Sequence, residues 1–283
     1  MQSLQTMINL LESNRNLHIS VSEFCDISNI QNLQLEFSNI IHSKEFCNLA
    51  KSTEKGVKYC LNCKKYANRK AVLQKNPFDG YCIYGLYEVT YPVLVNDRVI
   101  GVVYVGNAVT DESKTLNLMN KACRRTGANA ELMKNELLNC EHLKDPNELY
   151  QIADIVGNYL KYLYENSPKI KSNEHWTVSL MKRYAEKFYH KPISLTELSI
   201  TYQKSEKYIG RLFKKEVGMS FHQYCNYLRL KESEQLLKCS DYKVIDIAII
   251  CGFNNISYFN RLFQKEYKMS PKEYRKKHKV TRK

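Results

Sequence analysis

The spacing of apolar and polar positions predicts helices over most of the last third of the chain, and one apolar pattern there occurs twice. Segments 208–224 and 258–274 lie fifty residues apart and are identical at nine of seventeen positions. Agreement of that extent exceeds what shared helical composition produces. The pattern therefore indicates that one structural unit has been duplicated.

Each copy predicts a short helix, a tight turn and a second helix. Ser205 is the expected cap of the second helix in the first copy, while in the second copy Gly252 lies in the turn and either Asn255 or Ser257 is the cap. The apolar side is expected to comprise Leu195, Leu198, Ser199, Ile209, Leu212 and Phe213 in the first copy, and Val244, Ile247, Ala248, Phe259, Leu262 and Phe263 in the second. Two such units predict two helix-turn-helix motifs.

When the apolar side is buried, the second helix of each copy exposes a row of polar side chains to solvent. Arg, Asn and Ser side chains can hydrogen-bond base edges in the major groove. We predict that the rows bind double-stranded operator DNA, although a single row of this kind is more often just a solvated helix face. The DNA-binding candidates are Lys204, Ser205, Lys207, Arg211 and Lys214 in the first copy, and Ile256, Ser257, Asn260 and Arg261 in the second.

Charge is distributed unequally along the chain. The sequence contains 43 Lys and Arg residues and 29 Asp and Glu residues. Residues 170–283 hold 24 of the basic and 11 of the acidic residues, a net charge of +13, so residues 1–169 carry only +1. Contacts to phosphates require positive charge. The excess lies on the duplicated segment, and basic residues at 275–279 and 282–283 extend it.

The first half of the chain has a different pattern. Residues 87–95 and 98–105 are apolar, β-branched runs, and Asn96-Asp97 between them is typical of a type I′ hairpin. Consecutive apolar positions predict strands that are covered on both faces, and helices expected at 33–41, 60–76 and 115–140 can cover them. Pro92 indicates an edge strand or a bulge. The pattern predicts an α/β layered domain.

A domain of this kind can enclose a small molecule. We expect an effector site lined by aromatic and cysteine side chains, although aromatic residues in such places are more often core. The effector-binding candidates are Phe46, Cys47, Cys60, Cys63, Cys82, Tyr84, Tyr87 and Tyr91, with Tyr81 as a further aromatic candidate.

The ten cysteines divide into two groups. Most are expected to be small, reduced, buried residues; these are Cys25, Cys123, Cys140, Cys225, Cys239 and Cys251. Three interpretations stay open for Cys47, Cys60, Cys63 and Cys82: unligated thiols lining a pocket, a metal or iron–sulfur site, or a redox dithiol. The C-x-x-C pair is expected at a helix N-terminus, which favours thiolates.

A connector helix is expected at 146–166, between a sensory domain at 1–165 and a DNA-binding domain at 178–283, with a linker at 166–177. Apolar residues recur along it at spacings of three and four: Leu149, Ile152, Val156, Tyr159 and Leu163. Such a seam can pair two chains into a homodimer or pack against the sensory domain's own core. Both interpretations stay open at this point.

Residues from about Ser179 to His278 resemble the AraC-type DNA-binding domain, on the basis of the repeated Arg-Leu-Phe, Gly252-Phe253 and the closing segment 270–275. The resemblance implies one long helix at 220–238 joining the two units, recognition helices in successive major grooves about 34 Å apart, and an activator that works with RNA polymerase. The buried side of the long helix is expected to comprise Tyr224, Tyr227, Leu228, Leu236 and Leu237.

Residues 5–165 resemble the sensory domain of PocR-type regulators, through Phe46-Cys47, Cys60-x-x-Cys63, the segment 82–86, Tyr91-Pro92 and the segment 100–106. This resemblance implies a PAS-related fold and a small organic effector such as a simple diol. The expected fold is an α/β, PAS-like mixed sensory domain followed by an all-α double helix-turn-helix domain. The expected function is effector-controlled transcription regulation, with no cofactor required.

Two alternatives use the same cysteines. A DNA-repair methyltransferase with a four-cysteine zinc site also carries an AraC-like domain, but that resemblance calls for two close cysteine pairs and Cys60–Cys63 is the one such pair here. A metal- or redox-sensing regulator is the other alternative. The chain has no stretch near the roughly 18 apolar residues of a membrane span and no signal peptide at its start, so we expect a cytoplasmic protein with no membrane partner.

Overall fold

The computed structural model describes residues 2–24, 27, 30–40, 42, 44–168, 175–191, 195–201 and 204–278. By its contacts the chain divides into two compact units: residues 1–176 with 197–205, and residues 177–196 with 206–283. The boundaries expected at 165 and 178 stay predictions. Cys25, most of the expected linker and the basic tail beyond His278 lie outside the described residues.

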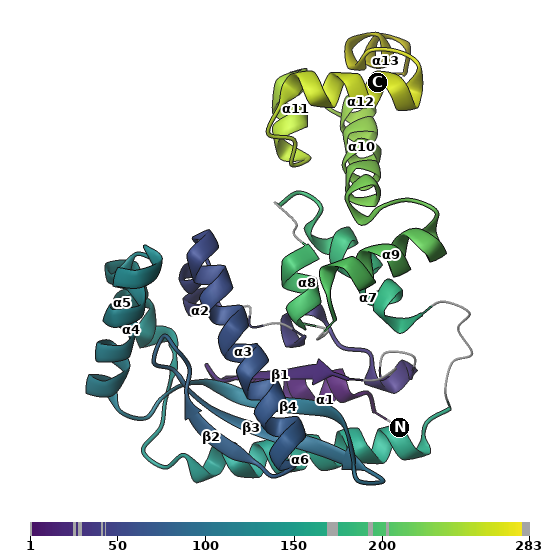
Figure 1. Cartoon of the computed structure of the whole chain (residues 1–283). Coiled ribbons are helices and arrows are strands. Elements are labelled where there is room, and N and C mark those ends of the chain that lie inside the picture. The colour runs from purple at the N-terminus through teal and green to yellow at the C-terminus, as the bar shows by residue number, and fades with distance from the viewer. Residues whose placement is uncertain are drawn as a thin grey trace. The chain divides into compact units, whose positions relative to one another are not determined.

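The N-terminal unit is a sheet with helices around it (Figure 1). Its described elements are α1 (Leu4–Glu12), β1 (His18–Glu23), the 3-10 turns η2 (Gln31–Leu33) and η3 (Phe37–Asn39), α2 (Glu45–Ala50), α3 (Glu54–Gln74), β2 (Phe78–Tyr81), β3 (Tyr87–Val95), β4 (Arg98–Val109), α4 (Glu112–Thr126), α5 (Ala130–Glu136), the 3-10 turn η4 (Leu137–Asn139), β5 (Glu141–His142) and α6 (Asn147–Asn166). The strand order is β1-β4-β3-β2, all antiparallel, and β5 pairs with β4 in parallel. A sheet with helices is confirmed, while the PAS-like assignment stays a prediction.

The predicted hairpin is confirmed. Strands β3 and β4 pair across Asn96 and Asp97, whose φ angles of 49° and 59° are those of a type I′ turn. Pro92 lies beyond the residues of β3 that pair with β2, and the ladder shifts register between Val93 and Leu94. The proline therefore occupies an unpaired edge next to an irregularity, where its missing N–H costs no ladder bond.

The predicted helices are partly wrong. The segment 33–41 contains short 3-10 turns, and the helix expected at 115–140 ends at Gly127, which adopts a φ of 77°. Helix α3 begins at Glu54, because Thr53 caps it by accepting the N–H of Gly56. The C-x-x-C pair thus lies in the middle of a helix, away from the terminus that would favour thiolates.

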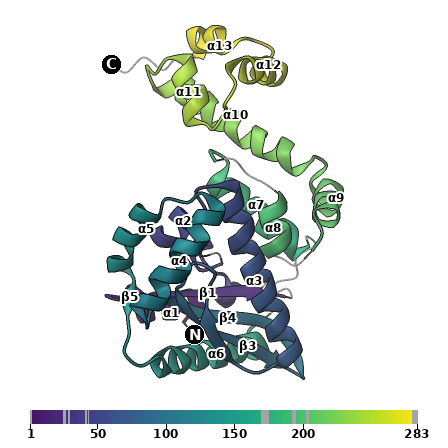
Figure 2. The same ribbon diagram turned by 60° about the vertical axis from the view of Figure 1, so that its left-hand side comes forward.

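Helices α3 and α6 both pack on β3 and β4, and they cover opposite faces of the sheet (Figures 1 and 2). Alternation along the strands divides the side chains: Tyr104 packs toward α3, whereas Tyr91 packs against Gly157 of α6. A Cβ atom on Gly157 would lie 2.5 Å from the Tyr91 ring, so glycine permits this close approach.

The connector helix is confirmed as α6, and its apolar seam belongs to the unit's own core. Leu149, Val156 and Leu163 are fully buried within the chain, where α6 contacts β3, β4 and α1. A seam buried in this way offers no surface to a second chain. The interpretation of this seam as a homodimer contact is therefore wrong, because the sheet already covers it.

Every described element from residue 176 onward is a helix. The helices from the connector onward are α7 (Trp176–Phe188), α8 (Leu195–Thr201), α9 (Glu206–Val217), α10 (Phe221–Cys239), α11 (Val244–Ile250), α12 (Ile256–Tyr267) and α13 (Pro271–His278). Gly252 ends the turn after α11 with a φ of 87°, and a Cβ there would lie 2.5 Å from the carbonyl oxygen of His190. The positive φ and the close approach of the His190 carbonyl both explain why this position is a glycine.

The long helix α10 begins with a capping box between Ser220 and Gln223. Of its expected buried side, Leu237 is fully buried and three residues are partly buried, but Tyr227 is 37% exposed. The prediction for Tyr227 is wrong, because Cys225 and Asn226 take the inward positions. Cys239, at the helix end, is exposed and not buried as expected.

Candidate functional site

Helix α12 is anchored by apolar side chains and capped at its start. Phe259 and Phe263 are fully buried, and the Asn255 side chain accepts the N–H of Tyr258 at 2.9 Å. This bond identifies Asn255 as the cap of the second copy and leaves Ser257 free of that role. With its core side fixed, the helix presents the opposite side outward.

The outward side of α12 consists of short polar and basic side chains. Ser257, Asn260 and Arg261 are all exposed. Ile256 differs, because it is partly buried and packs against the core of the second unit. Three of the four candidates on this helix are therefore available to a ligand, and Ile256 is mainly a core residue.

Arg261 is supported by its neighbours. Its guanidinium lies 5.4 Å from the centre of the Tyr258 ring, and the Tyr258 hydroxyl accepts a hydrogen bond from the Asn226 amide at 3.0 Å. Asn226 lies on α10 and is buried. A cation–π contact at an exposed site contributes about 0.5–1 kcal/mol. The contact therefore favours one position of the guanidinium, above the Tyr258 ring.

Helix α9 presents a different surface on the same backbone. Its buried anchors are Ile209 and Phe213, and Lys207, Arg211 and Lys214 are exposed, as are Lys204 and Ser205 before the helix. The Arg211 guanidinium donates to its own helix, at the carbonyl oxygen of Lys207. The row therefore offers mainly mobile ammonium groups, which bind phosphates as point charges.

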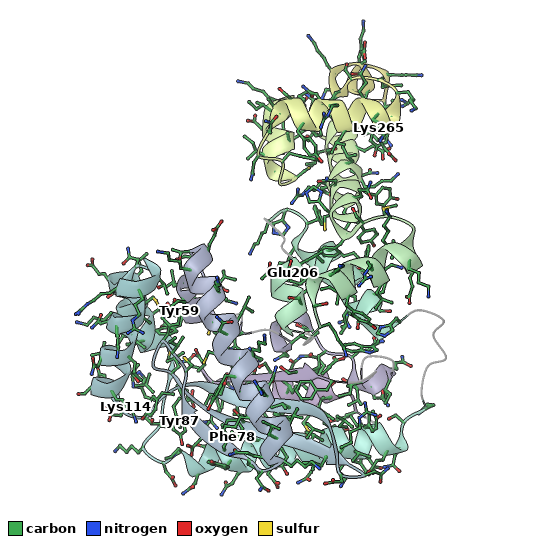
Figure 3. All side chains as sticks on the ribbon, in the orientation of Figure 1. Tyr59, Phe78, Tyr87, Lys114, Glu206 and Lys265 are labelled. Atoms are coloured by element: carbon green, nitrogen blue, oxygen red, sulfur yellow. The ribbon has the colours of Figure 1, made fainter. Side chains whose placement is uncertain are left out.

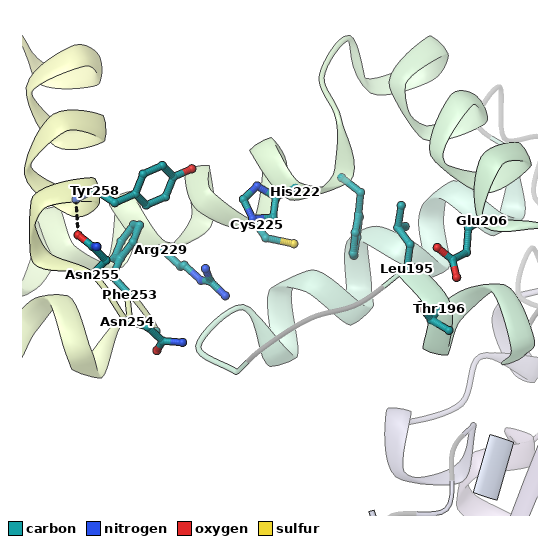
Figure 4. Close-up of a pocket in the computed structure, with 12 residues that line it drawn as sticks. Leu195, Thr196, Glu206, His222, Cys225, Arg229, Phe253, Asn254, Asn255 and Tyr258 are labelled. Atoms are coloured by element: carbon teal, nitrogen blue, oxygen red, sulfur yellow. Dashed lines mark hydrogen bonds between the residues drawn. The ribbon is translucent and has the colours of Figure 1, made fainter. Parts of the chain in front are cut away.

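A pocket of about 500 Å³ lies within this unit, beside α10 (Figure 4). Arg229 reaches into it, but its Nε and Nη2 donate to the carbonyl oxygens of Tyr189 and Lys191 at 2.6 and 3.0 Å. The guanidinium therefore ties α10 to the segment after α7. We assign this pocket a role in joining elements and not in binding a ligand.

The N-terminal unit contains a second cavity, of about 190 Å³, between α2, α3 and the strands β2 and β3. We call it the thiol-lined cavity. It brings together most of the effector candidates, which come from three separate segments: Phe46, Cys47, Cys60, Cys63, Tyr81, Cys82 and Tyr84. Phe78 on β2 also lines it, and Figure 3 marks that residue beside α3.

Two effector candidates lie elsewhere. The Tyr91 hydroxyl donates to Asp154 of α6 at 2.9 Å, and the Tyr87 ring packs edge-on against Tyr81. Glu88 and Thr90 line the cavity in their place. Side chains alternate along a strand, so a strand that presents Glu88 and Thr90 to the cavity turns Tyr91 toward α6.

A charged trio at the cavity wall was missed in the sequence. His42 Nε2 lies 3.2 Å from both Lys64 Nζ and Glu88 Oε2, and the Lys64 ammonium lies over the Tyr104 ring at 4.0 Å. Burial raises the pKa of Glu88 to about 7 and lowers the pKa of Lys64 to about 8. Burial and the Lys64 charge also lower the pKa of His42.

Lys64 and Glu88 compete for one nitrogen of the His42 ring. Nε2 carries either a proton or a lone pair, so it can donate to Glu88 or accept from Lys64, but not both. When Nε2 carries the proton, Lys64 keeps its hydrogen bond to the Ser20 hydroxyl at 3.3 Å and its contact with the Tyr104 ring. Lys64 and Glu88 both line the cavity, so a polar ligand can exchange hydrogen bonds with them. In the sequence, the position of Lys64 directly after Cys63 is what connects the trio with the cysteine candidates.

Burial favours the protonated thiol at three of the four cysteines. It raises the pKa of Cys47 to about 12, that of Cys63 to about 11, and that of Cys82 well above its usual range. Thiolates are the reactive and oxidisable form, so a freely reacting redox dithiol is disfavoured. Among the residues that the structure describes, no group of three or more His, Cys, Asp or Glu side chains could hold a metal ion.

Within the described ranges, no helix has the length and apolar character needed to cross a membrane. Comparison with known proteins identifies two regions. Residues 198–277 match the family described as "Helix-turn-helix domain", and residues 38–167 match the family described as "Sensory domain found in PocR". Together these regions include both α9 and α12 and the whole lining of the thiol-lined cavity.

Three similar proteins illustrate the match. The regulatory protein PocR of Salmonella typhimurium is 26% identical over 263 residues, covering 85% of this chain and 84% of that protein. The transcriptional activator RhaR of Yersinia pseudotuberculosis is 37% identical over 73 residues, 26% of this chain and 25% of that protein. The C-terminal domain of AraT from Geobacillus stearothermophilus, a solved structure, is 24% identical with a TM-score of 0.37, covering 39% of this chain and 92% of that one.

Proposed function

This chain is a transcription regulator that combines an AraC-type helix-turn-helix domain with a PocR-type sensory domain, and from that premise we propose that α9 and α12 bind operator DNA under the control of a small organic effector in the thiol-lined cavity. The matched relatives are regulators, so the interpretation as a DNA-repair methyltransferase is wrong.

The DNA-binding role is supported chiefly by the α12 surface. Arg261 and Asn260 are exposed beside each other on a helix whose core side is fixed, and Arg261 is stacked on a hydrogen-bonded tyrosine. Arg and Asn are the side chains that form bidentate pairs with guanine and adenine. The exposed lysines of α9 add phosphate contacts, which position a protein on the duplex without reading its sequence.

Selection of duplexes from a random library by the full chain tests this role. We expect one duplex to be bound at least about 10³ times more tightly than random competitor at moderate salt. Affinity for every duplex should fall as salt rises, because phosphate contacts release counterions. Equal affinity for the selected and the random duplexes would contradict the proposal.

The effector role is supported by the cavity and by the polar Lys64–His42–Glu88 trio that lines it. A thermal-shift screen of the full chain against small metabolites tests it, since a ligand at a hundredfold excess over Kd stabilises by about 2.7 kcal/mol. Ala67→Phe places a ring in the cavity and should abolish the shift. Val72→Phe, on the exposed side of the same helix, is the matched control.

We further propose that the chain activates transcription through RNA polymerase and works in the cytoplasm, where the DNA is. The likeness to an activator, RhaR, over 73 residues supports activation. Transcription in vitro from the selected duplex, with purified polymerase, should rise when the chain and its effector are added. A fall in transcript under the same conditions would show repression instead.

A further inference from the structure

Four cysteines from three parts of the chain line the same cavity. Cys47 comes from α2, Cys60 and Cys63 from successive turns of α3, and Cys82 from the turn between β2 and β3. The i, i+3 spacing puts the two cysteines of α3 on one face of that helix. Four thiols in one small cavity far exceed what filling apolar space requires, because each could be an Ala or Val.

Two of these sulfur atoms accept hydrogen bonds from the backbone. The N–H of Ile83 donates to Cys63 and the N–H of Tyr84 donates to Cys82, and each bond acts to lower the pKa of its thiol. The turn that provides them is itself fixed, since Cys82 N–H donates to the Leu86 carbonyl at 2.7 Å. Hydrogen bonds to sulfur stabilise a charged ligand sulfur and are a feature of iron–sulfur sites.

Positive charge is also present at the cavity. The Lys64 side chain lines the cavity together with the four cysteines, as does Glu88. Metal ions supply the charge that would complete the site, and their binding deprotonates thiols.

The geometry distinguishes between kinds of metal site. A zinc ion needs three or four ligands converging on one point, and the described residues contain no group of three that could hold a single ion. A four-iron cluster takes one thiolate per iron, so its four ligands surround a volume and do not converge. The four thiols line one cavity of about 190 Å³ and come from α2, α3 and the turn after β2, so they can bind separate irons of one cluster.

We infer that Cys47, Cys60, Cys63 and Cys82 bind a four-iron, four-sulfide cluster. Each thiol gives up its proton to the solvent and forms one S–Fe bond, and the step transfers no electron to or from the protein. This inference goes beyond the proposed function, because it assigns the four thiols to a cluster whether or not an effector also binds to the cavity.

The test uses the full chain, purified without oxygen from cells supplied with iron. We expect about four irons and four acid-labile sulfides per chain, a broad visible absorbance and an EPR signal after reduction. The double variant Cys60→Ser, Cys63→Ser should lose at least nine-tenths of the iron and sulfide. The variant Cys239→Ser, whose thiol is exposed and outside the cavity, should retain both.

Zinc alone, about one iron per chain, or equal iron in the wild type and the double variant would each overturn the inference. If the double variant does not fold, the wild-type chain decides: after reconstitution with equal amounts of ferrous and ferric iron and with sulfide, Cys60 and Cys63 should resist alkylation, and unchanged alkylation of both would refute the site. DNA binding by the same preparations is measured separately, so failure of the cluster and failure of the proposed function are distinguishable.

Discussion

Helices α9 and α12 are copies of one segment, and the comparison shows which positions the fold constrains. Both keep a fully buried phenylalanine at the same place, Phe213 and Phe263. Their outer faces differ, because α9 presents Lys207 and Lys214 whereas α12 presents Asn260 and a stacked Arg261. The duplicated core was retained while the surfaces diverged, from which we expect α9 to anchor the complex and α12 to select the sequence.

A second difference lies in one repeated contact. In the second copy the Tyr274 hydroxyl donates to Glu234 at 2.7 Å, and Glu234 also accepts from Lys238 and Tyr267. In the first copy the equivalent Tyr224 donates to Glu186 at 3.3 Å, in solvent. The repeated tyrosine therefore donates to a buried carboxylate in one copy and to an exposed carboxylate in the other, and the contribution of its hydroxyl to stability should differ accordingly.

The largest expected effects test the equivalence of the two cores. Phe213→Ala and Phe263→Ala each remove a fully buried ring and should lower the free energy of unfolding by about 3–5 kcal/mol. Urea denaturation of the two variants measures this. If the losses of unfolding free energy in the two variants differed by more than about 2 kcal/mol, the two cores would not be equivalent. One core would then tolerate a cavity that the other does not.

The next effect concerns Glu234. Burial alone would raise its pKa, but hydrogen bonds from Lys238, Tyr274 and Tyr267 outweigh burial and lower the pKa to about 2. An unfolded Glu titrates near about 4.3, so this stabilisation is complete above that pH and is lost as pH falls toward 2.

Glu234→Gln should therefore cost about 2–3 kcal/mol at pH 7 and flatten the dependence of unfolding on pH between about 4.5 and 2. Thermal unfolding across that range measures both. Glu186→Gln is the matched control, because Glu186 is exposed and should change stability by less than about 0.5 kcal/mol. An unchanged pH profile in the Glu234 variant would show that the buried pair does not act as described.

The two recognition faces can be separated by DNA affinity. Arg261→Ala should weaken binding to the selected duplex by about 1–3 kcal/mol and relax the preference at one base pair. Lys214→Ala should weaken binding to all duplexes alike. It should also reduce the slope of log affinity against log salt concentration by about 1. If Arg261→Ala lowered affinity for random duplexes as much as for the selected one, the division of roles between α9 and α12 would be wrong.

The smallest effects compare the two tyrosines. Tyr274→Phe removes a buried hydrogen bond to a carboxylate and should cost about 1.5–3 kcal/mol if that bond contributes fully, less if Lys238 and Tyr267 compensate. Tyr224→Phe removes an exposed one and should cost less than about 0.5 kcal/mol. Urea denaturation at pH 7 measures the loss of unfolding free energy in each variant. Equal losses would contradict the expectation that burial strengthens the contribution of the Tyr274 hydroxyl.

Much of the helical half could be predicted from the sequence. The repeat at 208–224 and 258–274 predicted both helices α9 and α12, and the 3.6-residue period predicted their buried sides, because these depend on local spacing. The hairpin at Asn96-Asp97 was predictable for the same reason. Tyr227 was misplaced, since neighbouring positions on a long helix differ only in which other elements happen to pack there.

Only the tertiary structure decided what the α6 seam packs against and which side chains meet at the cavity of the N-terminal unit. Whether the apolar seam of α6 meets a second chain or its own sheet depends on β3 and β4, which are distant in sequence. The trio of His42, Lys64 and Glu88 likewise joins three segments with no shared motif. The sequence determined the local elements, because backbone spacing acts over a few residues. Packing between distant segments determined the cavity, because contacts at long separation leave no periodic signal in the chain.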